Sequence, residues 1–144
     1  MADFTQKDTQ IPMLGQVAPR TNKDLGALIT LTAAGAGTTD SADQVNTSSR
    51  GVMVTIDVSA KTGTIDLVVS IQRKDPASGV YTTLLSSSSI TTVSTTTLIV
   101  TPDIADSANA IKQTFLGENW RVRAVSGTGS SPAITGTISA CLIP

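Results

Sequence analysis

The chain has 144 residues and a formal net charge of −1, with ten Lys and Arg against eleven Asp and Glu. This length fits one domain with its own core, and the scattered cations exclude the basic stripe typical of nucleic-acid binders. With no His and a single Cys, the chain lacks the commonest metal ligand and general base, and it cannot form an internal disulfide. We therefore expect a protein that is not an enzyme, with no catalytic residues, no cofactor and no metal.

Apolar residues make up 40% of the chain but aromatic residues only 3%, so the core must consist mainly of Val, Ile, Leu and Ala. Together with the many Ser and Thr residues, this composition favours β-strands. The N-terminus has no basic segment followed by an apolar one, and no stretch approaches the roughly 18 apolar residues of a membrane span. The sequence predicts a soluble protein made in a cytoplasm, without a membrane partner.

Residues 1–24 are polar and contain Pro12 and Pro19, so they cannot form a core of their own. They are either a frayed terminus or an extended arm that becomes ordered on a neighbouring subunit. The arm interpretation divides the chain into an N-terminal arm, 1–24, and a β-sandwich domain, 25–144. Under it, the candidate partner-binding residues are four apolar side chains and one cation of the arm: Ile11, Met13, Leu14, Val17 and Arg20.

The first predicted strand spans residues 25–33, with Leu25, Ala27, Ile29 and Leu31 on one side. The segment that follows, 34–50, is rich in Gly, Ser, Thr and Asp. Its length indicates a mobile surface loop or a functional contact loop.

Strict alternation of apolar and polar residues predicts two further strands, at 52–59 and 65–72. The break between them is too short for a crossover helix, so they are predicted to pair as an antiparallel hairpin. The sequence Asp-Pro-Ala-Ser-Gly at 75–79 then combines residues that favour a tight turn. A third strand at 80–86 would complete a meander.

Another strand is predicted at 95–101, and Asp103 then caps a predicted helix. In that helix Ile104, Ala108, Ile111 and Phe115 recur at helical spacing, and Gly117 would end it. Two strands remain, at 118–126 and 133–143. Their inward residues are predicted to be Trp120, Val122 and Ala124 in the first, and Ile134, Ile138, Ala140 and Leu142 in the second.

These elements predict an all-β fold, an antiparallel β-sandwich of about seven strands with one short helical crossover and an extended N-terminal arm. The paired cysteines of antibody domains are missing. An Ig-like sandwich and a jelly roll both remain open.

One pair of carboxylates stands out in the predicted hairpin. If Val58 pairs with Ile65, Asp57 lies directly opposite Asp66, which is unfavourable. A register slipped by two residues, a neighbouring cation such as Arg121 or Arg123, or bound calcium would each relieve the repulsion. Two carboxylates fall short of the six to eight oxygens that calcium prefers, so the first two explanations are favoured.

Three segments, 51–60, 71–85 and 119–127, resemble small β-rich virion proteins of tailed bacteriophages, the capsid decoration or cement proteins. The motifs that carry the resemblance are Lys74-Asp75-Pro76 with Gly79 and Tyr81, and Trp120-Arg121-Val122. The resemblance covers roughly 50–142, and each motif also has a structural reason to be present, so it argues for a shared fold more strongly than for a shared role.

The resemblance implies a non-enzymatic protein that binds the outer capsid surface, where several subunits of the major capsid protein meet, often as a trimer. A tail, neck or head-fibre component would suit the same fold. A carbohydrate or cell-surface binding module is a third alternative, although such modules usually present exposed aromatic side chains.

Overall fold

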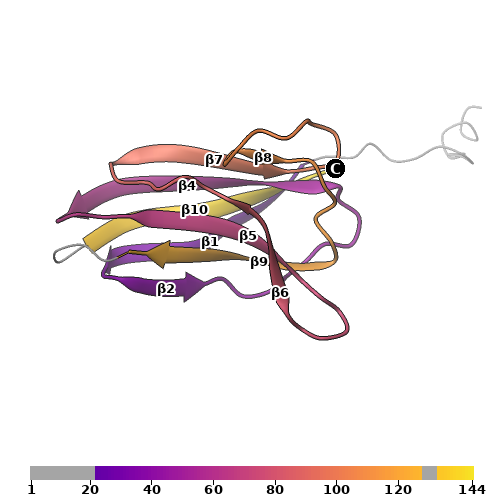
Figure 1. Ribbon diagram of the computed structural model, residues 1–144, viewed down its shortest axis with the longest axis horizontal. Coiled ribbons are helices and arrows are strands. Elements are labelled where there is room, and N and C mark those ends of the chain that lie inside the picture. Colours follow the sequence, from indigo (N-terminus) through magenta and orange to yellow (C-terminus); the bar gives the residue numbers. More distant parts are fainter. Residues whose placement is uncertain (1–21, 128–132) are drawn as a thin grey trace, which may run out of the picture.

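The computed structural model describes residues 22–127 and 133–144, which form ten strands in two layers (Figure 1). The first layer, sheet A, has the order β1 (Lys23–Ala34), β10 (Ala133–Ile143), β4 (Gly51–Thr62), β7 (Ser94–Val100) and β8 (Ile111–Lys112). The second layer, sheet B, has the order β2 (Gly37–Asp40), β9 (Asn119–Ser126), β5 (Leu67–Lys74) and β6 (Tyr81–Ser86), and β3 (Gln44–Val45) also pairs with β9. All these pairings are antiparallel except β7 with β8. The all-β class and the sandwich are therefore confirmed.

The core lies between the two sheets and consists of the inward halves of alternating strands. On β4, Val52, Val54, Ile56 and Val58 are buried, as their period of two predicts. The inward residues predicted for the last two strands are all buried as well, Trp120 completely. Because Val, Ile and Leu fill nearly all of this core, Trp120 is its one large aromatic anchor.

The predicted hairpin of 52–59 with 65–72 is wrong. The first segment lies in β4 of sheet A and the second in β5 of sheet B, so the residues between them carry the chain from one layer to the other. The second predicted hairpin is confirmed: β5 pairs with β6 across the turn at Asp75, whose amide bonds the carbonyl of Val80. Gly79 supplies the positive φ of 75° that the turn requires.

The predicted helix at 104–115 is also wrong. The segment instead forms turns and the short strand β8, in which Ile111 pairs with Ile99 of β7. Ile104 and Phe115 are exposed, so the four residues do not form one buried apolar face. A helix of about three turns has little stability without such packing.

Strand β1 begins at Lys23, two residues before the predicted domain start, and forms one edge of sheet A. Its pairing with β10 contains three register shifts, so Ile29 and Leu31 are buried while Ala27 is exposed. The segment predicted as a mobile surface loop or a contact loop, 34–50, contributes β2 and β3, and both pair with β9.

Three connections meet at one end of the sandwich, the end where Figure 1 marks the C-terminus. The amide of Asn46 donates to the carbonyl of Gly117 at 3.2 Å, and Arg50 forms an ion pair with Asp103 at 3.0 Å. These bonds join loops that are far apart in sequence. We call this region the loop end and define it as residues 43–50, 73–80 and 101–119.

Candidate functional site

The outer face of sheet B carries a network of paired charges. Arg123 of β9 donates two hydrogen bonds to Asp40 of β2, at 2.7 and 2.8 Å, and Arg121 lies 3.1 Å from the same carboxylate. Alternation along β9 places both arginines outward while Trp120 and Val122 point inward. Asp40 thus ties the short edge strand β2 to the middle of the sheet.

The network continues toward the loop end through Tyr81. The hydroxyl of Tyr81 donates to Asp43 at 2.6 Å, and Lys74 contacts the same carboxylate at 2.8 Å. The guanidinium of Arg121 stacks on the Tyr81 ring, 3.5 Å from its centroid, and bonds Gln72 at 2.9 Å. Residues of β2, β5, β6 and β9 and of the 41–43 connection are therefore held together on one face.

These contacts shift the pKa of both carboxyl groups. The hydrogen bond from Arg123 lowers the pKa of Asp40, and the hydrogen bonds from Lys74 and Tyr81 lower the pKa of Asp43. Because the folded-state pKa lies below the unfolded one, the stabilisation is present above the ordinary value of 3.8 and is lost as the pH falls through the folded-state pKa.

Replacing Asp40 with Asn is expected to lower the free energy of unfolding by about 1 kcal/mol at pH 7, since the arginines lose their carboxylate. At pH 2, which lies below the ordinary pKa of 3.8, less of the wild-type carboxyl group is ionised than at pH 7, so the difference between the two proteins should be smaller. Chemical denaturation at both pH values measures this, with Thr38→Ala in the same strand as the control. An equal deficit at both pH values would contradict an electrostatic origin.

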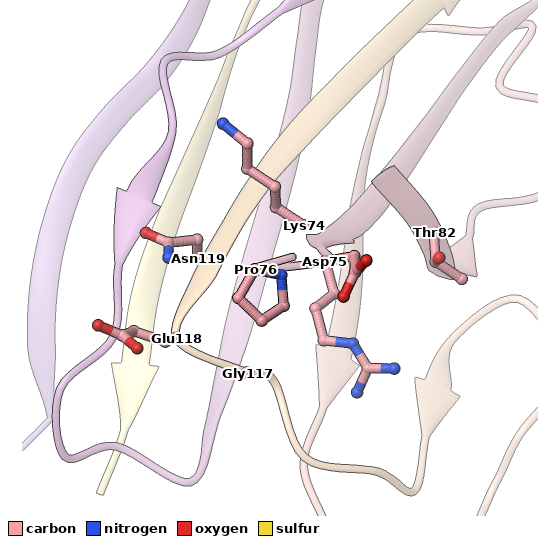
Figure 2. Close-up of a pocket in the computed structure, with 8 residues that line it drawn as sticks. Lys74, Asp75, Pro76, Thr82, Gly117, Glu118 and Asn119 are labelled. Carbon is pink, nitrogen blue, oxygen red and sulfur yellow. The ribbon is translucent and has the colours of Figure 1, made fainter. Parts of the chain in front are cut away.

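Beside the network, a hollow of about 510 Å³ opens at the loop end (Figure 2). The hairpin turn after β5 and the segment leading into β9 form its walls. Its lining residues are Arg73, Lys74, Asp75, Pro76, Thr82, Gly117, Glu118 and Asn119. Figure 2 shows the carboxylate of Glu118 on the side of the hollow away from Thr82.

The position of Arg73 in this hollow depends on Gly117. A Cβ at position 117 would lie only 2.6 Å from Cδ and 2.9 Å from Cγ of Arg73, so the aliphatic part of the arginine rests directly on the glycine backbone. Gly117 also has a φ of 91°, which other residues rarely adopt. A glycine is therefore required here both by the backbone and by the arginine.

The candidate partner-binding residues of the arm, Ile11, Met13, Leu14, Val17 and Arg20, lie outside the described residues. Asp57 lies in β4 of sheet A, whereas Asp66 directly precedes β5 of sheet B, and the two do not oppose each other. Asp57 accepts a bond from Thr95 at 3.2 Å, and Asp66 accepts one from Ser89.

A neighbouring cation was one of the explanations considered for that pair, but Arg121 and Arg123 face Asp40 instead. Asp40 and Asp43 were missed by the sequence reasoning, since β2 and β3 are too short and polar to show a period. The Asp residues within 34–50 were the available signal for this network, because carboxylates in a polar loop can pair with the outward arginines of a strand.

Within 22–127 and 133–144, no three His, Cys, Asp or Glu side chains are grouped so that they could hold a metal ion. In the same part of the chain, no helix is long and apolar enough to cross a membrane.

No protein-family model matches the sequence, and no curated protein matches it significantly. One solved structure to which the chain has a weak similarity is the structure of infectious bursal disease virus Gx strain, with a TM-score of 0.44 and 13% sequence identity. The match covers 92% of this chain but only 38% of that chain.

Proposed function

We propose that this chain is a structural virion protein that binds the outer surface of a bacteriophage capsid and stabilises it. Its partners are the major capsid protein and further copies of the chain itself, most simply as a trimer. The protein is made in the host cytoplasm and resides on the capsid surface. The proposal starts from the resemblance of segments 51–60, 71–85 and 119–127 to decoration proteins, and one structural observation supports attachment through a defined surface.

That observation is the gathering of exposed apolar side chains at the loop end. Of the seven large apolar side chains exposed among the described residues, four lie there: Val45, Val80, Ile104 and Phe115. Phe115 is the most exposed, at 65%. Exposed apolar side chains that cluster on one surface are typical of interaction sites. The loop end is therefore the part of the domain best suited to attachment.

The outer face of sheet A supports the self-association part of the proposal. In the middle of this face, Thr55 of β4 pairs with Thr97 of β7 and with Ser139 of β10. Thr137 of β10 pairs with Asp57 of β4. A sheet face with so few charges loses little solvation when another copy covers it, and charge depletion is a feature of interface cores.

The N-terminal arm is proposed to add to capsid binding. Because β1 begins at Lys23, a chain that starts at Lys23 should retain the whole sandwich. A chain that starts at Leu25, the domain start predicted from the sequence, would lack two residues of β1. We expect the chain beginning at Lys23 to unfold at the same denaturant concentration as the full chain but to bind capsids several-fold more weakly. Equal binding by the two chains would remove the arm from the proposal.

The test is cosedimentation of the full chain with purified heads, and separately with purified tails, of the virus that encodes it. Binding to heads alone, with a head that withstands more heat, supports the proposal. At a hundredfold excess over Kd, such binding contributes about 2.7 kcal/mol per site. Binding only to tails would assign the protein to the tail or neck instead. Sedimentation velocity of the free protein reads its oligomeric state.

A further inference from the structure

The cations of the loop end differ in whether they form an ion pair. Arg50, Lys74 and Lys112 each form an ion pair with an aspartate, at 3.0, 2.8 and 2.9 Å. Arg73 makes no ion pair with any described residue. It is nevertheless positioned, because its stem rests on Gly117 at the wall of the 510 Å³ hollow. Its charge is therefore available to a group from outside.

We propose that the hollow is the specific contact of this protein with its partner, and that Arg73 receives a carboxylate side chain of a protein surface. This inference rests on the proposed function and names the part of the loop end that determines recognition. A guanidinium presents parallel N–H donors that match the two oxygens of a carboxylate. Since Gly117 already holds the stem, less side-chain freedom is lost on binding.

The other walls of the hollow indicate what surrounds that carboxylate. Pro76 and the aliphatic parts of Lys74 and Thr82 offer apolar surface, and Asn119 offers an amide. Val80 follows the β5–β6 turn and Phe115 precedes Gly117 by two residues in the chain, and both are exposed. The matching surface is a single Asp or Glu flanked by apolar residues.

A polyanion fits this hollow less well than a protein carboxylate. Glu118 and Asp75 line it together with Arg73, and the carboxylate of Asp75 already accepts bonds from the amide and hydroxyl of Ser78. A phosphodiester chain that approaches Arg73 would therefore meet two negative charges. A single carboxylate brings one negative charge and not a chain of them.

The experiment measures the affinity of full-length variants for purified heads at low and moderate salt. Arg73→Glu is matched by Lys61→Glu, which makes the same charge change at the exposed far end of β4. Phe115→Ser is matched by Val93→Ser, a similarly exposed apolar residue at the far end of the sandwich. All four positions are exposed, so thermal unfolding should confirm that each variant folds like the wild type.

We expect Arg73→Glu and Phe115→Ser to weaken binding by at least about tenfold, and the two controls by less than about twofold. The loss in Arg73→Glu should be larger at low salt, where screening is weaker. If the wild type binds heads and Arg73→Glu behaves like Lys61→Glu, the hollow is not the contact, although the proposed function stands. If the wild type does not bind heads, both proposals fail.

Discussion

Replacing Trp120 with Ala is expected to lower the free energy of unfolding by about 3 to 5 kcal/mol. Trp120 has no exposed surface and is the only large aromatic side chain in the core. The Val, Ile and Leu residues around it are branched and held by two sheets, so they cannot collapse fully into the space that an indole leaves. A loss of this size approaches the whole stability of many domains of this length.

Chemical denaturation followed by circular dichroism measures the loss. Trp120→Phe is the matched control: it keeps much of the ring volume and removes the indole N–H, which has no hydrogen-bond partner among the described residues. We expect it to cost clearly less than Trp120→Ala. Because Trp120 is the only Trp, its wild-type fluorescence should shift to longer wavelength on unfolding. An Ala variant within about 1 kcal/mol of the wild type would contradict the anchor role.

The second large effect is expected at Gly136, in the middle of β10. Gly136 pairs with Leu31 of β1 on one side and with Val58 of β4 on the other. A Cβ at this position would overlap the backbone carbonyl of Asp57. The overlap is with backbone and not with a movable side chain, so the two strands would have to separate.

Gly136→Ala should therefore lower the free energy of unfolding by about 3 kcal/mol or more, or prevent folding. The control is Thr137→Ala, the next residue, whose side chain is on the outer face and whose loss should cost about 0.5 kcal/mol. Urea denaturation of both variants measures the two losses in the free energy of unfolding. Equal stability would show that the close approach of β10 to β4 is not needed.

Alternation predicted most strands but could not predict their partners. Residues 52–59 and 65–72 each have a clear period of two, which reports only that one face of each strand is buried. The apolar face of β4 and the apolar face of β5 are buried in the same core, but the two strands belong to opposite sheets. A short connection favours a hairpin, yet here it crosses between layers, because β10 and β7 occupy both edges of β4.

Elements that depend on distant partners were the ones missed. β2 and β3 have no apolar pattern and exist because β9 offers them an edge. The predicted helix rested on four residues at helical spacing, and pairing of Ile111 with Ile99 prevailed over that local pattern. The turn at 75–79, by contrast, depends only on its own residues, and its prediction was confirmed.

The candidate site was predictable only in part. The alternation of β9 predicted that Arg121 and Arg123 point outward. It could not indicate their partner Asp40, which lies 83 residues before Arg123 in the chain. The hollow likewise joins the β5–β6 turn to Gly117, which alternation within either segment could not indicate. Arg73, the cation of the hollow that forms no ion pair with a described residue, occupies an inward position of β5 but is exposed, because it lies beyond the end of the core.

The order of strands in sheet A also determines when the protein can fold during its synthesis. β10, the last strand made, lies between β1 and β4, two strands made much earlier. Until residues 133–143 have left the ribosome, β1 has no partner in its sheet and β4 lacks one of its two neighbours. Sheet A therefore closes only after β10 has been made, and until then the apolar faces of β1 and β4 lack this neighbour.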